Sequence, residues 1–142
     1  MSRLSGLTAL GIQSPADPDE MLAVMRRRVC YTEGRATGFY PVAMVPRCWL
    51  DLAEGILGRP VELVVFQGYR NGAAVCASHV DDYDQVILSL GATRTMQIGD
   101  TTRQVDHGSL THLPIGTPHA ILPDQTEEGE RISLVFRARS LQ

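Results

Sequence analysis

From Val61 almost to the C-terminus, the sequence is a succession of short apolar runs separated by turn residues. Runs of this length, bounded by glycine, proline, asparagine or aspartate, are typical of β-strands. The pattern predicts strands at residues 61 to 69, 73 to 79, 85 to 98, 101 to 106, 109 to 113, 119 to 122 and 130 to 138. Gly99-Asp100 is a two-residue hairpin signal, and Arg70-Asn71-Gly72 marks another turn. So many short strands in series predict an all-β barrel.

The residues before Val61 have a different pattern, which predicts two helices. Residues 1 to 17 are interpreted as an irregular arm. Pro18-Asp19-Glu20 begins a helix that ends in Arg26-Arg27-Arg28, with acids at its start and bases at its end, as the helix dipole favours. A second helix begins near Pro46 and stops at Gly58. At 142 residues the chain suits a single domain: residues 18 to 142, with helices to about residue 60 and a barrel from 61 to 138.

Composition gives little sign of a nucleic-acid or membrane partner. The net charge of −3 and the pI near 5.7 provide no basic field of the kind that binds phosphates. Three cysteines, without CxxC spacing, indicate neither a disulfide framework nor a cysteine zinc site. The sequence has no signal-peptide pattern and no apolar run of membrane-spanning length. We therefore expect a cytoplasmic protein with no membrane partner.

Two histidines and an aspartate form the candidate site. His79-Val80-Asp81 places an imidazole and a carboxylate two residues apart, which on a strand is the same face. His119 follows a Pro114–Pro118 turn, where a barrel could return it to the first pair. Two histidines and one carboxylate hold iron and leave three coordination positions open. The alternative is a surface histidine beside a turn aspartate.

The last predicted strand has one apolar and one polar face. Alternate residues Ile132, Leu134 and Phe136 form the apolar face, which leaves Arg131, Ser133 and Arg137 together on the other. Two arginines on one strand face suggest a clamp for a dicarboxylate, since a guanidinium binds a carboxylate with two hydrogen bonds. The alternative is an edge strand whose arginines are solvated.

Together these blocks resemble the AlkB-like family of Fe(II)/2-oxoglutarate-dependent dioxygenases, from about Val45 to Arg137. The matching pieces are Pro46 to Leu57, Tyr69-Arg70-Asn71-Gly72, His79-Val80-Asp81-Asp82, Leu88 to Arg94, His107-Gly108-Ser109-Leu110, His119 and the strand Arg131 to Arg137. The resemblance implies a double-stranded β-helix (jelly-roll) barrel. It also implies that His79, Asp81 and His119 ligate Fe(II), with 2-oxoglutarate and O2 as cosubstrates.

By the same resemblance, Tyr69 and Arg131 hold 2-oxoglutarate and Arg137 lines the same pocket. Gln67 and Ser133 stand where the family has asparagines, and they are cosubstrate contacts by position. Tyr83 replaces the acid with which nucleic-acid repair members read a damaged base, and so becomes the candidate substrate contact. His107 and His112 match no ligand and are interpreted as structural.

The resemblance implies hydroxylation or oxidative demethylation of a substrate. Tyr83 and the net negative charge favour a small-molecule substrate, for which a nucleoside-like compound is one candidate. One alternative is an AlkB-type demethylase that repairs alkylated DNA or RNA. A second is a cupin-type metal- or ligand-binding module without oxygenase activity. Gly108, Pro114, Gly116 and His119 have the spacing of the second cupin motif, but Asp81 stands where the first motif needs a histidine. Substrate identity and oligomeric state are left open.

Overall fold

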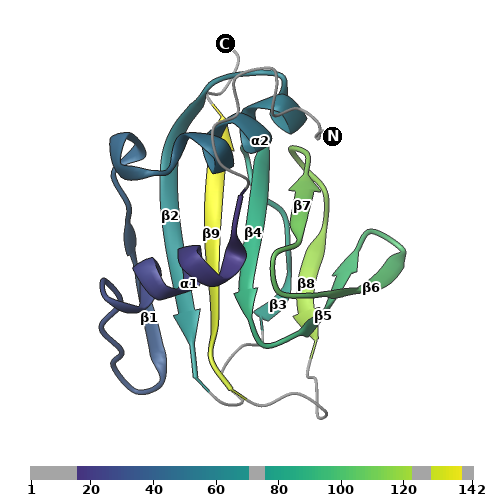
Figure 1. Cartoon of the computed structure of the whole chain (residues 1–142). Coiled ribbons are helices and arrows are strands. Elements are labelled where there is room, and N and C mark those ends of the chain that lie inside the picture. The colour runs from purple at the N-terminus through teal and green to yellow at the C-terminus, as the bar shows by residue number, and fades with distance from the viewer. Residues whose placement is uncertain (1–15, 71–75, 123–128, 139–142) are drawn as a thin grey trace.

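A computed structural model of the chain describes residues 16–70, 76–122 and 129–138, and Figure 1 shows two helices against a pair of β-sheets. The larger sheet has the strand order β1-β2-β9-β4-β7, and the smaller one β3-β8-β5-β6. All pairings are antiparallel. The elements are α1 (Pro18–Arg26), β1 (Arg35–Phe39), the 3-10 helix η2 (Val42–Met44), α2 (Arg47–Leu57), β2 (Val61–Tyr69), β3 (Cys76–His79), β4 (Gln85–Gly91), β5 (Arg94–Ile98), β6 (Thr101–Val105), β7 (Leu110–Leu113), β8 (His119–Leu122) and β9 (Arg131–Ala138).

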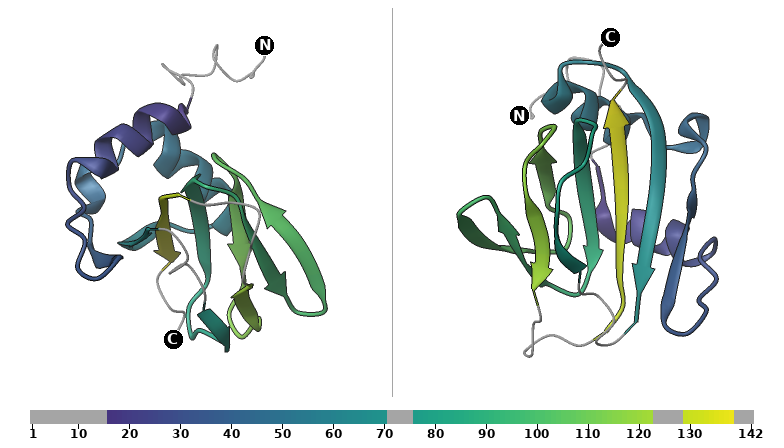
Figure 2. Two further views of the ribbon diagram at one scale, coloured as in Figure 1. Left: turned by 90° about the horizontal axis from the view of Figure 1, so that it is seen from below. Right: turned by 180° about the vertical axis from the view of Figure 1, so that it is seen from behind.

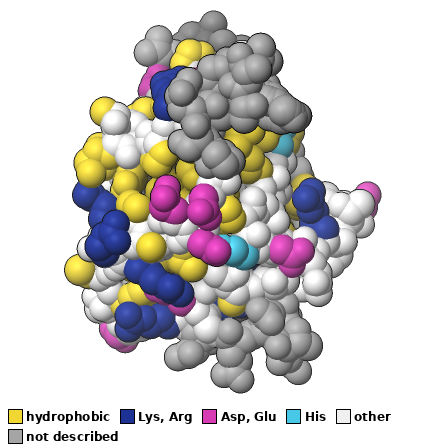
Figure 3. Space-filling model, in the orientation of Figure 1, with side chains coloured by type: hydrophobic (Ala, Val, Ile, Leu, Met, Phe, Trp, Pro, Cys, Tyr) yellow, Lys and Arg dark blue, Asp and Glu magenta, His cyan; other side chains and the backbone are white. Residues whose placement is uncertain are grey.

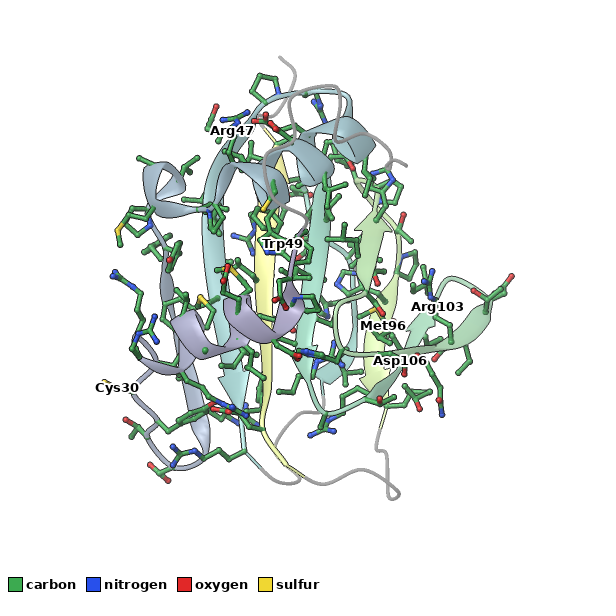
Figure 4. The ribbon with its side chains drawn as sticks, viewed as in Figure 1. Cys30, Arg47, Trp49, Met96, Arg103 and Asp106 are labelled. Carbon is green, nitrogen blue, oxygen red and sulfur yellow. The ribbon has the colours of Figure 1, made fainter. Side chains whose placement is uncertain are left out.

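Local signals account for both helices. At the start of α1, the side chain of Asp17 accepts a hydrogen bond from the backbone N–H of Asp19 at 3.0 Å, and Pro18 occupies the first turn, where it costs no hydrogen bond. The second helix, α2, ends at Gly58, whose φ of 73° is the left-handed conformation that glycine adopts without strain. Trp49 projects from α2 into the core (Figure 4).

Both helices cover one face of the larger sheet, as the view from below shows (Figure 2). A first hydrophobic core lies between the helices and the larger sheet, and it includes Met21, Met25, Trp49, Leu50, Ala53, Val64, Phe66, Val86, Leu88, Leu90, Ile132, Leu134 and Phe136. A second, smaller core lies between the sheets and contains Val65, Ile87, Met96, Val105, Leu113 and Val135. The larger sheet is therefore buried on both faces in its middle strands. On the outer, helix-bearing surface, acidic side chains gather near the centre and arginines toward one side (Figure 3).

The predicted fold class is confirmed, because the chain is a mainly β, single-domain, double-stranded β-helix with helices before the barrel. The two helices and the Gly99-Asp100 hairpin, which joins β5 to β6, are also confirmed. The predicted arm lies almost entirely outside the described residues. The predicted Arg70-Asn71-Gly72 turn lies partly outside them. Within the described part of the chain, no helix is both long enough and apolar enough to cross a bilayer.

One strand prediction is wrong, and one strand was missed. Residues 85 to 98 form β4 and β5, which belong to different sheets. The chain bends at Gly91, where φ is +92° and an added Cβ would lie 2.3 Å from the carbonyl oxygen of Glu130. The edge strand β1 was not predicted, because only Phe39 in it is a large apolar residue and its face is mostly exposed.

Candidate metal centre

The three predicted metal ligands meet at one end of the space between the sheets. His79, the last residue of β3, pairs with His119, the first residue of β8, and their ring centroids are 4.3 Å apart. From the turn after β3, the Oδ2 atom of Asp81 lies 3.3 Å from Nε2 of His119 and 3.8 Å from Nε2 of His79. Adjacent ligands on an octahedral metal with bonds of about 2.1 Å stand about 3 Å apart. The spacing therefore suits a single ion.

Neighbouring groups orient two of these ligands. Nδ1 of His119 donates to the carbonyl oxygen of Thr117 at 3.0 Å, which leaves the lone pair of a neutral ring on Nε2, the atom that faces Asp81. The Oδ2 atom of Asp81 accepts a hydrogen bond of 2.7 Å from the side-chain amide of Gln85. The backbone N–H of Gly116 donates to the carbonyl of Asp81 at 3.1 Å, which ties the two ligand-bearing loops together.

The donor set fits a first-row divalent metal. Two imidazole nitrogens and one carboxylate oxygen lie within 4.8 Å of one another. Among the described residues, no fourth histidine, cysteine, aspartate or glutamate belongs to this group. Such a 2-His-1-carboxylate set occupies one face of the metal and leaves positions for exogenous ligands. His119 is buried and His79 is exposed, so the group opens toward solvent on the side of β3.

A cavity of about 310 Å³ adjoins the three ligands, and we call it the metal cavity. Its volume lies at the lower end of the range for small-molecule sites. It is lined by Gln67, Tyr69, His79, Asp81, Tyr83, Gln85, Ile87, Met96, His119, Ile121, Arg131, Ser133, Val135 and Arg137. All nine residues predicted for the site are therefore on its wall. Figure 4 labels Met96, which β5 contributes from the smaller sheet.

Arg131 stands at the start of β9, at the end of that strand remote from the metal ligands. It is only 2% exposed, and its Nη2 donates to Oγ of Ser89 at 3.0 Å. The preceding Glu130 anchors this end of β9 to the helical layer, accepting hydrogen bonds from Nε of Arg26 at 2.6 Å and from the hydroxyl of Tyr31. Although burial alone would raise the pKa of Glu130, these two hydrogen bonds and the charge of Arg26 lower it below its ordinary value.

Arg137 stands at the other end of β9, beside the metal ligands. It pairs across the sheet with Gln85, which holds Asp81, and its guanidinium lies 3.9 Å from the ring centroid of Tyr83. The buried Nε of Arg137 makes no hydrogen bond to any described residue. Burial, with the nearby charge of Asp81, raises the pKa of the Tyr83 hydroxyl, while the charge of Arg137 opposes that rise.

Sequence reasoning missed several residues of the site and misplaced one. Gln85 was not singled out, although its position four residues after Asp81, with Ile87 next on the same strand face, is a usable signal. The period of a strand was used to place Asp81 beside His79, but β3 ends at His79, as predicted, and Asp81 lies in the turn that follows. His107 and His112 lie outside the metal cavity, where each makes a 2.7 Å contact with an aspartate, Asp19 and Asp84 respectively.

Comparison with known proteins gives matches at the level of structure alone. No protein-family model and no curated protein matches the sequence. A conserved protein of unknown function from Streptococcus pyogenes superposes with a TM-score of 0.55 at 15% identity, covering 91% of this chain and 90% of its own. A cupin superfamily protein from Desulfitobacterium hafniense gives 0.52 at 9% identity, covering 78% and 83%. A predicted oxalate decarboxylase from Thermotoga maritima gives 0.51 at 10% identity, covering 73% and 79%.

These neighbours correct the family assignment. The resemblance to AlkB-like dioxygenases is wrong as a relationship, since the structural neighbours named above include a cupin superfamily protein and a predicted oxalate decarboxylase, and none of the three is an AlkB-like enzyme. Some of the blocks that suggested it contribute residues to the metal cavity, namely those with Tyr69, His79, Asp81, His119 and Arg131, whereas Pro46–Leu57 includes helix α2 and His107 lies outside the cavity. Short blocks of this kind do not establish descent. At identities this low the comparison shows the fold and not the activity. The chain is a double-stranded β-helix that carries a candidate metal centre and is similar in fold to a cupin superfamily protein.

Proposed function

We propose that this protein is a mononuclear metal enzyme in which His79, Asp81 and His119 hold Fe(II) and Arg131 receives a carboxylate of a bound organic acid. The observation that carries the proposal is the pairing, within one cavity, of a 2-His-1-carboxylate set with a buried arginine. Fe(II) held in this way supplies oxygen activation at its open positions. The reaction that this arrangement supports best is oxygenation with a 2-oxo dicarboxylic acid, 2-oxoglutarate, as cosubstrate.

The polar groups of the cavity suit a dicarboxylate. Arg131 and Arg137 lie at its two ends, and Ile87 and Val135 line the wall between them. A guanidinium keeps its charge when buried and forms paired hydrogen bonds with a carboxylate. One carboxylate at Arg131 and a second beside Arg137 would place the 2-oxo end of such an acid near the metal ligands.

The other predicted residues have roles consistent with this proposal. Tyr69 pairs with Arg131 across β2 and β9, and Gln67 pairs with Ser133, so all four stand beside one another on the cavity wall. We assign them to cosubstrate binding. Tyr83, held against Arg137 near the metal ligands, is assigned to the substrate side, and the substrate to a small molecule.

A second candidate function is that of a cupin-type metal- or ligand-binding module without oxygenase activity. The cupin superfamily protein among the structural neighbours favours it. In that case the same three residues bind a metal, and Arg131 holds an acid that is not oxidised. The two functions share the metal site and differ in what happens to 2-oxoglutarate.

One set of measurements tests the proposal. We expect one Fe(II) per chain, a metal-dependent rise in melting temperature on addition of 2-oxoglutarate, and slow succinate formation in air. His119→Ala should lose the metal, whereas His112→Ala should keep it, because His112 lies outside the metal cavity. Metal binding with no response to 2-oxoglutarate would support the second candidate. Full iron content in His119→Ala would refute both.

A further inference from the structure

The barrel-side face of the larger sheet continues past the barrel onto its edge strand, β1. Residue pairing aligns Arg35 with Tyr69, and Tyr69 with Arg131. The neighbouring row aligns Thr37 with Gln67, and Gln67 with Ser133. Two rows of polar side chains thus run from inside the metal cavity across β2 to the edge of the sheet. Arg35 and Thr37 are exposed where these rows end.

A second cavity, of about 470 Å³, lies over this part of the sheet, and we call it the edge cavity. It is lined by Cys30, Thr32, Arg35, Ala36, Thr37, Gln67 and Tyr69. Gln67 and Tyr69 also line the metal cavity, so the two cavities adjoin across these two side chains. A ligand in the edge cavity would therefore contact the same residues as a ligand beside the metal.

The chemistry of the edge cavity suits an anion. Its only charged lining residue among those described is Arg35, whose guanidinium carbon lies 5.9 Å from the ring centroid of Tyr69. Within the described ranges, Arg35 forms no salt bridge. The hydroxyl of Thr37 and the amide of Gln67 add hydrogen-bonding groups beside it. Because none of the described residues that line the cavity is a carboxylate, a negatively charged ligand would be attracted by Arg35 without repulsion from the cavity wall.

We infer that the edge cavity binds the part of the substrate remote from the metal, and that this part carries an anionic oxygen group, a carboxylate or a phosphate, held by Arg35. The inference rests on the proposed function, since it takes the metal cavity as the reaction site. Strands β1 and β9 are two strand spacings apart, about 10 Å. Because the metal ligands lie toward the opposite end of β9 from Arg131, the substrate must be an elongated organic anion that spans more than this distance, passing beside Tyr69 to reach the metal.

The test uses the zinc-loaded, isotope-labelled full chain with saturating 2-oxoglutarate. Phenyl phosphate, benzoate and the neutral benzyl alcohol are titrated in turn, and the amide resonance of Thr37 reports binding. We expect at least one of the two anions to shift this resonance and benzyl alcohol to leave it in place. The tighter of the two anions identifies the acid group of the substrate.

Variants of Arg35 and one matched control complete the test. Arg35→Ala should weaken anion binding about three- to fivefold, as expected for a partly solvated ion pair, and Arg35→Glu should abolish it. Arg103→Glu, at an exposed position on β6 in the other sheet, should change it by less than about twofold. The inference is overturned if neither anion shifts Thr37, if benzyl alcohol binds equally well, or if Arg103→Glu loses as much as Arg35→Glu. A failure of the proposed function would be distinguished from this outcome: no succinate would form, and addition of 2-oxoglutarate would not shift the amide resonance of Ser133.

Discussion

Replacing Gln85 with leucine tests whether the hydrogen bond behind Asp81 prepares the metal site. Gln85 is 3% exposed, and its amide donates to the Oδ2 atom of Asp81 at 2.7 Å. Leucine fills a similar volume but offers no donor, so the carboxylate would lose one partner and gain freedom to rotate. Partners of this kind orient metal ligands and keep them ready to bind.

The size of the effect follows from that one hydrogen bond. A bond to a charged group contributes about 1.5–3 kcal/mol, which corresponds to roughly 10- to 150-fold in a binding constant. Losses of about 10- to 100-fold are typical when such a partner of a metal ligand is removed. The side chain of Asp81 is 22% exposed, so water can replace part of the interaction. We expect the lower end of the range, a loss of about tenfold in metal affinity.

Competition with a chromogenic chelator would measure the affinity for Fe(II) in anaerobic solution and for Zn(II) as a redox-inert substitute. Gln97→Leu is the matched control, because Gln97 is exposed on β5 and does not line the metal cavity. Its metal affinity should equal that of the unchanged protein. Equal affinities in Gln85→Leu and the control, with both proteins folded, would refute the idea that Gln85 holds Asp81 for the metal.

Three further predictions concern Arg131 and its surroundings. Arg131→Leu should weaken 2-oxoglutarate binding about 30-fold or more, because a buried cation would no longer meet the carboxylate. Calorimetry would measure this, and the metal affinity should be unchanged. An unchanged affinity for 2-oxoglutarate would exclude Arg131 as the carboxylate-binding residue. Gly91→Ala should lower the free energy of unfolding, measured with denaturant, by at least about 2 kcal/mol, because Gly91 has a positive φ and the new Cβ would lie 2.3 Å from a carbonyl oxygen. The control Gly55→Ala, in open space on α2, should raise it by about 0.5–1 kcal/mol. Glu130→Gln should lower the melting temperature at neutral pH. Because the pKa of Glu130 is lowered in the folded protein, its charged form stabilises the fold at pH values above the ordinary pKa of 4.5, and this stabilisation is lost as the pH falls below 4.5 and through the lowered pKa. A melting-temperature difference that persists unchanged at pH 3 would contradict this.

The sequence predicts the barrel because strands buried on one face alternate and a strand buried on both faces, such as β4, is a short apolar run. The polar–apolar alternation of Arg131 to Arg137 predicted β9 and the division of its two faces. The pattern alone did not separate β4 from β5, since the bend at Gly91 depends on contact with Glu130, which is distant in sequence. The exposed edge strand β1 carries almost no such signal.

The three candidate metal ligands could be singled out because His-x-Asp and a later histidine form a recognisable pattern, and the structure brings them together. What the sequence could not show is how they are held: the amide of Gln85 and the carbonyl of Thr117 become visible only once the loops are placed in space. Nor did the pattern distinguish families, because short blocks around a metal site are compatible with more than one kind of double-stranded β-helix. Arg35 escaped notice for the same reason as its strand.

Strand β9 serves the helix-side core with one set of side chains and the metal cavity with the other, and this limits how the protein can vary. A one-residue insertion or deletion within it would exchange the two faces. The charge of Arg131 would then turn toward the apolar residues under the helices, and Ile132 would take its place on the cavity wall. Stability and ligand binding would be lost in the same event. The length of β9 is therefore constrained, and length differences among variants of this chain should lie outside this strand.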